Sequence, residues 1–243
     1  MKLLALGLLI PLSACSFSSS SDAKGTAIPA QGSGAARTFQ VADFTGIALR
    51  GSDDIDVRVG TGFSVRAEGA SEDLDKLRIG RDGTMLDVGR KPNTGMNWGK
   101  GGKVRVFVTL PRLVEADVAG SGNMTVDRIE GGAFAGGIAG SGNLRIAALQ
   151  VENADFSIAG SGDAIAAGTA KALKIEIAGS GSVDGSKLRA QSASVEIVGS
   201  GDATAVVDGS AKVDMIGSGD VDLGPNARCT VSKMGSGTVR CAR

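Results

Sequence analysis

The tripeptide Gly-Ser-Gly recurs along the second half of the chain and constrains its fold more than any other feature. It begins at Gly120, Gly140, Gly160, Gly179, Gly199, Gly217 and Gly235, so successive copies lie 20, 20, 19, 20, 18 and 18 residues apart. A repeat of this length is one supersecondary unit, and a single unit cannot bury its own apolar face. We therefore expect units that stack on one another.

Apolar and polar residues alternate on both sides of each tripeptide. The position two residues before the first glycine holds Val118, Ile138, Ile158, Ile177, Ile197, Met215 and Lys233; the position four residues after it holds Met124, Leu144, Ala164, Val183, Ala203, Val221 and Val239. A period of two with one apolar face indicates half-buried strands. Each unit should therefore be a strand, a tight glycine corner, a second strand and a looser return.

These units predict an all-β fold, a β-helix-like solenoid with coils of about 20 residues and Gly-Ser-Gly corners. Glycine adopts positive φ without steric cost, and small corners let neighbouring coils approach at the β spacing of about 4.8 Å. A meander of antiparallel hairpins remains an alternative, whereas propeller repeats of about 40 residues are twice the observed period. We place the solenoid at residues 114–243, after a strand-rich portion at 37–113, and expect 37–243 to form one continuous domain.

The residue after each Gly-Ser-Gly is small and polar: Asn123, Asn143, Asp163, Ser182, Asp202, Asp220 and Thr238. One interpretation is that these side chains cap the corners by hydrogen-bonding to their own backbone. The alternative is that the aspartates of this column bind a cation through oxygen ligands. Acids occupy adjacent units only once, which favours turn chemistry, and we expect no metal site.

The composition excludes several classes of function. The chain has no histidine, and 26 Lys and Arg balance 26 Asp and Glu. Without histidine it can build neither a Ser-His-Asp nor a Cys-His nucleophile, and no histidine-ligated metal centre. The balanced charge offers no basic surface for nucleic acid. We expect no cofactor and no nucleic-acid partner.

Residues 1–14 predict a signal peptide. Lys2 precedes an apolar run, residues 3–12, that is too short to span a bilayer, and two small residues follow it. The sequence Leu-Ser-Ala-Cys at 12–15 resembles the lipobox of bacterial lipoproteins, which implies acyl chains on Cys15 as a membrane anchor. Ser16 follows the cysteine, and by resemblance to Gram-negative lipoproteins this implies the outer membrane, with the domain in the periplasm or at the surface.

Residues 15–36 predict the lipidated cysteine and a flexible tether, because they are rich in Ser, Gly and Ala and show no periodicity. Two further cysteines, Cys229 and Cys241, lie six residues before and six residues after Gly235. Both fall at inward-facing positions, and in an oxidising compartment they predict a disulfide that staples the last coil. A pair of buried free thiols is the alternative.

Two features of the front half are candidate sites. The Gly-rich loop at 90–103 holds the only tryptophan, Trp98, beside Arg and Lys. This residue is a weak candidate for contact with a sugar or a protein partner, although a lone tryptophan more often covers the edge of a core. Asp53, Asp54 and Asp56 are the candidate carboxylates for an enzyme, although alternation places Asp54 and Asp56 on an outward, solvated face.

Several segments in order resemble a known family: "FTGIALRGSDDIDV", "EDLDKLRI", "GTMLDV", "VRVFVTLPRL" and the repeated "GSGD". They are similar to the bacterial envelope family described as putative autotransporter adhesin, head GIN domain, over about residues 38–240. The resemblance implies an exported, often lipidated protein with a β-helix-like fold, for which right-handed coils are expected. It implies no catalytic residues.

We therefore expect a non-catalytic lipoprotein of the cell envelope, an adhesin or scaffold that presents a repetitive β surface to a glycan or an envelope protein. A polysaccharide lyase or hydrolase on a β-helix is the alternative, and it requires convergent charged groups in a groove. A small-lipid carrier would need a cavity, whereas the apolar columns look filled.

Overall fold

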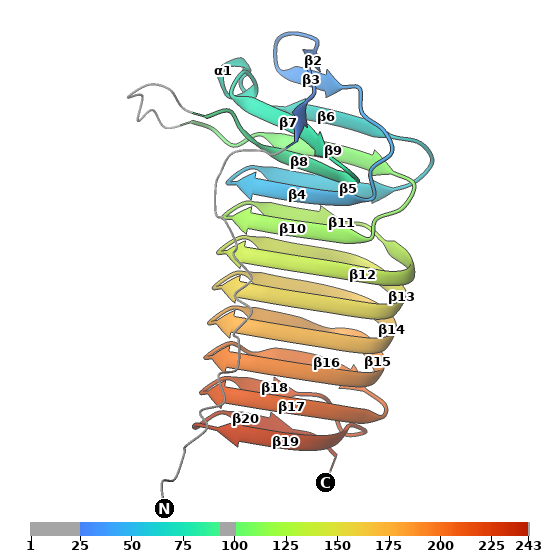
Figure 1. Cartoon of the computed structure of the whole chain (residues 1–243), viewed down its shortest axis with the longest axis vertical. Helices are drawn as coiled ribbons and strands as arrows, with labels where there is room; N and C mark the ends of the chain where they lie inside the picture. The colour runs from blue at the N-terminus through green and yellow to red at the C-terminus, as the bar shows by residue number, and fades with distance from the viewer. Residues whose placement is uncertain (1–24, 93–100, 243) are drawn as a thin grey trace, which may run out of the picture.

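The computed structural model describes residues 25–92 and 101–242, and this part of the chain is almost entirely β-structure (Figure 1). Its one helix is α1 (Ser71–Leu74). No helix within the described ranges is long and apolar enough to cross a membrane.

The second half of the chain is a parallel β-solenoid. Its strands are β10 (Glu115–Gly120), β11 (Asn123–Val126), β12 (Ile129–Gly140), β13 (Asn143–Gly160), β14 (Asp163–Gly179), β15 (Ser182–Gly199), β16 (Ala203–Val207), β17 (Ser210–Gly217), β18 (Asp220–Asp222), β19 (Arg228–Met234) and β20 (Thr238–Arg240). Each strand segment pairs in parallel with its counterpart about one repeat later, as between β13 and β14. The solenoid is confirmed, because a meander of hairpins would pair its strands antiparallel.

The glycine corners stack in register. Gly140 lies opposite Gly160, and Gly160 lies opposite Gly179. From Gly51 to Gly160, the carbonyl of each corner's first glycine accepts two hydrogen bonds from the next corner: Gly140 O accepts from the backbone N–H groups of Ser161 at 2.8 Å and Gly162 at 3.0 Å. A side chain would block this contact, since a Cβ on Gly160 (φ +134°) would lie 2.3 Å from that oxygen.

The alternating apolar columns form the core. Val118, Ile138, Ile158, Ile177, Ile197 and Met215 are each at most 2% exposed. Phe134 and Phe156 add an edge-to-face ring pair with centroids 6.0 Å apart. Burial of about 25 cal/mol per Å² of apolar surface in such a continuous column stabilises units that could not fold alone.

The solenoid begins earlier than residue 114. In the front half, β4 (Gly46–Gly51) pairs in parallel with β10 and places Gly51 opposite Gly120, while β5 (Asp54–Val59) pairs in parallel with β11. These two strands form a first coil whose corner is Gly51-Ser52-Asp53. The boundary expected at 113/114 is therefore not a structural division, because the degenerate corner keeps the same register.

A cap closes the N-terminal end of the stack. The strands β8 (Met85–Arg90) and β9 (Arg105–Leu110) pair in parallel with β4 and β5. Antiparallel strands then cover them: β3 (Ala36–Phe39), β6 (Ser64–Glu68) and β7 (Leu77–Asp82). A hairpin turn at Gly83-Thr84 joins β7 to β8.

Residues 25–36 lie on this cap, although we expected them within the tether. The strand β1 (Thr26–Ala27) pairs antiparallel with β7, and β2 (Ala30–Gln31) pairs antiparallel with β3. The side chain of Ile28, between them, packs against the core. Two-residue strands are too short to produce a hydrophobic period, so the sequence pattern could not reveal them.

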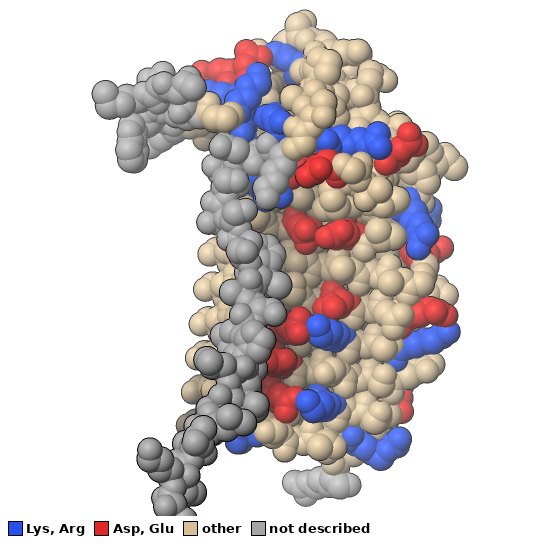
Figure 2. Space-filling model, in the orientation of Figure 1, with Lys and Arg blue, Asp and Glu red and all other residues tan. Residues whose placement is uncertain are grey.

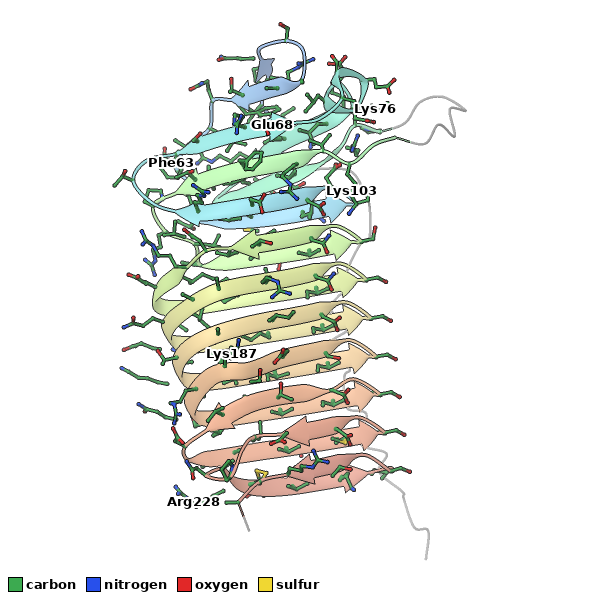
Figure 3. The ribbon with its side chains drawn as sticks, turned by 180° about the vertical axis from the view of Figure 1, so that it is seen from behind. Phe63, Glu68, Lys76, Lys103, Lys187 and Arg228 are labelled. Carbon is green, nitrogen blue, oxygen red and sulfur yellow. A yellow bond between two sulfur atoms is a disulfide. The ribbon has the colours of Figure 1, made fainter. Side chains whose placement is uncertain are left out.

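A disulfide closes the last coil of the solenoid. Cys229 and Cys241 are bonded, with their Cα atoms 6.1 Å apart, as the spacing predicted. Lys233 stands in the column that is aliphatic in earlier coils, and its ammonium donates to the Gly237 carbonyl at 2.6 Å. An inward-pointing charge on a terminal strand discourages edge-to-edge association. Figure 3 shows this end near Arg228, opposite the cap with Glu68, Lys76 and Lys103.

Candidate functional site

Two predicted site residues, Cys15 and Trp98, lie outside the described residues. Lipidation of Cys15 and a binding role for Trp98 therefore stay predictions.

The three candidate carboxylates of the first coil have separate partners and do not converge. Asp53 is fully buried and accepts from Nε of Arg90 at 2.7 Å and from the backbone N–H of Val104 at 2.8 Å. Asp54 pairs with Lys103 at 3.2 Å, and Asp56 pairs with Arg105 at 3.5 Å. The Asp53–Arg90 pair was not visible in the sequence, because 37 residues separate its members.

The role of Asp53 is structural. Arg90 also donates to the carbonyls of Asp73 at 3.1 Å and Gly102 at 3.0 Å, and the Asp73 carboxylate accepts from the Gly102 N–H at 2.8 Å. This buried cluster fastens the first corner to α1 and to the strand entering β9. A charge is tolerated in such a place only when it is paired and hydrogen-bonded.

The polar residues after each corner form a ladder between coils. Asp163 Oδ1 accepts from the N–H of Ser182 at 3.0 Å, and Asp202 Oδ1 accepts from the N–H of Asp220 at 2.8 Å. Asp220 Oδ1 accepts in turn from Thr238 at 2.9 Å. We expected these oxygens to bond to their own backbone. They instead reach the next coil, because equivalent residues of adjacent coils lie only about 4.8 Å apart.

This corner ladder uses its aspartates as acceptors for backbone N–H groups. Within residues 25–92 and 101–242, no group of three or more Asp, Glu or Cys residues is placed to hold a metal ion. The ladder begins at Asp54, which accepts from the Asn123 side chain at 2.8 Å. Burial alone would raise the pKa of Asp54, but hydrogen bonds from Asn123 and Lys103 hold this pKa below its usual value.

One carboxyl on the outer face of β10 is strongly perturbed. Burial, reinforced by the charge of Glu115, raises the pKa of Asp117 to about 6, against a smaller opposing effect of Arg50. A Cβ added to the neighbouring Gly137 would lie 2.4 Å from Asp117 Oδ1, so the carboxyl is covered by the next coil.

A hollow of the solenoid lies along its return bends, which follow the right-hand edge in Figure 1. We call it the return-edge groove. It is a hollow of about 410 Å³ lined by Glu130, Gly131, Gln150, Val151, Glu152, Thr169, Ala170, Lys171 and Gln191. A second hollow of about 350 Å³ continues it along the chain and is lined by Asn153, Ala154, Asp155, Ala172, Leu173, Lys174, Ser192, Ala193 and Ser194.

Differences in coil length are absorbed close to this groove. The glycine corners stack without a register shift, so differences in coil length must be absorbed at the return bends. The pairing of β13 with β14 shifts between Ile146 and Leu149, and that of β14 with β15 shifts between Ile165 and Ala167. Such bulges bend the strand and re-aim its side chains.

The lining of the groove is suited to polar contact. Val151 and Ala170 form a nearly buried floor, at 7% and 6% exposure. Gln150 and Gln191 present amides from two of the coils, and Lys171 pairs with Glu152 at 2.5 Å. That hydrogen bond lowers the pKa of Glu152, which is therefore an ionised acceptor at neutral pH and a poor general acid.

A carboxylate of the second hollow behaves differently. Burial raises the pKa of Asp155, with a smaller contribution from Glu176 and an opposing one from Lys174, whose ammonium lies 3.8 Å away. Glu152 and Asp155 are each paired with a lysine one coil further on. Sequence reasoning missed the groove, because its residues carry no motif and gather only through stacking.

Similar solved structures support the fold. A putative adhesin from Bacteroides fragilis matches with a TM-score of 0.74 and 20% identity, over 85% of this chain and 95% of that one. A putative lipid binding protein from Parabacteroides distasonis matches with a TM-score of 0.69 and 20% identity, over 88% of this chain and 98% of that one. A putative adhesin from Parabacteroides merdae matches with a TM-score of 0.68 and 18% identity, over 88% of this chain and 98% of that one. At these identities the likeness concerns the fold.

No curated protein matches the chain. The family model described as "Putative auto-transporter adhesin, head GIN domain" matches residues 43–241, which span the first coil, most of the cap and the whole solenoid. The chain belongs to the putative auto-transporter adhesin, head GIN domain family.

Proposed function

We propose that this protein is a non-catalytic binding module of the cell envelope, adhesin-like in role, that engages a glycan through the return-edge groove. The observation that carries the proposal is the groove itself, which presents polar side chains from several stacked coils over a small apolar floor. Amide and hydroxyl groups on a rigid scaffold can pair with sugar hydroxyls at little entropic cost. Membership of a family described as adhesins supports the same role.

The proposed location follows from the first residues of the chain. Acyl chains on Cys15 would hold the protein at a membrane, and the residues up to Gly25 would tether the domain. The family description is consistent with an envelope protein.

Binding to a glycan array by the whole chain tests the proposal. We expect saturable binding that falls at least fivefold in the double variant Gln150→Ala/Gln191→Ala. The matched control is Gln31→Ala, an exposed glutamine of the cap strand β2. Loss of binding in the control alone, or binding by the double variant equal to that of the wild type, would show that the groove is not the glycan site.

A polysaccharide hydrolase or lyase is the second candidate, favoured by the opposite pKa shifts of Glu152 in the return-edge groove and Asp155 in the hollow that continues it. It predicts turnover of the bound glycan that Asp155→Asn abolishes. The binding-module proposal predicts bound glycan that stays intact on prolonged incubation, so measured cleavage would decide for the enzyme.

A further inference from the structure

An exposed apolar stripe runs along the corner edge of the last coils, at the opposite end of the strands from the return-edge groove. It consists of Val198, Ile216 and Met234, which are 49%, 57% and 72% exposed. The three residues are stacked, with Val198 opposite Ile216 and Ile216 opposite Met234. We call them the corner stripe.

Corner geometry does not require this stripe. Each member is the residue immediately before the first glycine of a corner, and earlier coils have alanine there: Ala119, Ala139, Ala159 and Ala178. Alanine is therefore sufficient for stacking. The described surface has four large exposed hydrophobic side chains, and three of them lie in this one column. Exposed apolar residues that gather in one patch mark contact surfaces.

Acidic side chains flank the stripe on both sides. Glu196 and Asp214 lie two residues before Val198 and Ile216 on the same face, where Lys212 pairs with Asp214 at 2.5 Å, and Asp202 and Asp220 lie beyond the corner. Figure 2 shows Asp and Glu in a column on this face of the solenoid, with Lys or Arg beside some of them. Residues 114–242 contain ten Lys and Arg against fifteen Asp and Glu, so the region carries excess negative charge.

The spacing of the stripe selects the shape of its partner. Adjacent coils lie about 4.8 Å apart, so the stripe spans about 10 Å over two steps. An α-helix places residues i, i+3 or i+4, and i+7 on one face over about 10.5 Å, whereas alternate residues of a strand are about 6.8 Å apart. Apolar side chains on a helix face therefore match the coil spacing, and those of a strand do not.

We infer that the corner stripe is a docking surface for a basic amphipathic helix of a partner protein. Leu-like side chains of the helix would cover Val198, Ile216 and Met234, and flanking Lys or Arg would face the acidic residues. A second copy of this chain would bring like charges together, and an anionic membrane would be repelled by the same acids. This surface is separate from the groove of the proposed function.

Peptide binding to the full chain tests the inference. The probe is an 18-residue peptide of Leu and Lys with Leu at helical spacing, and its counterparts replace Lys with Glu or Leu with Ser. By fluorescence anisotropy we expect saturable binding of the Leu-Lys peptide only, weakened by salt. The triple variant Val198→Ser/Ile216→Ser/Met234→Ser should lower its affinity at least tenfold.

The control is Val231→Ser, because Val231 is 45% exposed but belongs to an inward column at the open end of the stack. This variant should retain affinity within twofold. Equal binding by the triple variant, or equal binding of the Glu or Ser peptide, would overturn the inference. So would concentration-dependent dimerisation, or binding to anionic vesicles, that the triple variant abolishes. Thermal unfolding at an unchanged temperature would show that the triple variant is folded.

Discussion

Replacing the first glycine of a central corner should destabilise the protein far more than replacing a glycine elsewhere. In Gly160→Ala the new residue inherits φ +134°, where side chains rarely occur, at a cost of about 1–3 kcal/mol. Its Cβ also meets the Gly140 carbonyl at 2.3 Å. Moving that carbonyl weakens the two hydrogen bonds from Ser161 and Gly162, each contributing about 1 kcal/mol. We expect a total loss of about 3–5 kcal/mol in the free energy of unfolding.

Three further variants separate the two causes. Gly162→Ala has the clash without the positive φ, since its Cβ would lie 2.1 Å from Gly142 O, and it should cost about 2–3 kcal/mol. Gly62→Ala has a φ of +80° with nothing within 4 Å, and it should cost about 1 kcal/mol. Gly132→Ala has neither feature and should change stability by less than about 1 kcal/mol.

Urea unfolding followed by circular dichroism, with the disulfide intact, measures all four variants. The reasoning is refuted if Gly160→Ala and Gly162→Ala unfold at the same urea concentration as Gly132→Ala. A cost in Gly62→Ala equal to that in Gly160→Ala would show that φ alone matters and that coil contact does not.

Three more predictions concern single interactions. Because the pKa of Asp117 is raised to about 6, the folded state holds the proton of this carboxyl more tightly than the unfolded chain does. Asp117→Asn should therefore add up to about 3 kcal/mol to the free energy of unfolding above pH 6 and little at pH 4. A difference in stability between variant and wild type that does not change with pH would contradict this. Replacing Cys229 and Cys241 by serine should lower the free energy of unfolding by roughly 3 kcal/mol and lower the unfolding temperature. Equal unfolding temperatures for the reduced and the oxidised wild type would contradict this. Asp163→Ala should cost about 1–2 kcal/mol, while Asp163→Asn, which keeps an acceptor for Ser182, should cost less than half as much in the same unfolding assay.

The solenoid was predictable because its signals are local and repeated. The columns around Ile158 and Leu144 specify strand faces, and the glycine spacing specifies the coil length. The cysteine pair was predictable for the same reason, since Cys229 and Cys241 occupy equivalent inward positions around one corner.

The remaining features depend on contacts between distant segments. The Asp53–Arg90 pair and the short strands β1 and β2 are set by the cap, whose antiparallel strands do not follow the repeat. The return-edge groove lies beside register shifts, which depend on how coils of different length stack. The direction of the corner ladder also depends on the distance to the next coil, which an isolated turn does not have.

The spacing between corners tests the central claim of one coil per repeat most directly. Spin labels can be placed at pairs of the exposed corner serines by a chemistry that leaves the native cysteines intact. Pulsed electron paramagnetic resonance then measures the distance between the two labels of one molecule. From Ser141, the solenoid predicts separations that grow by about 4.8 Å per repeat, to about 14 Å at Ser200 and about 24 Å at Ser236 before label length is added. Growth of about 9.6 Å per repeat, as two antiparallel strands per unit would give, or distances without a constant increment, would contradict the stacked coils.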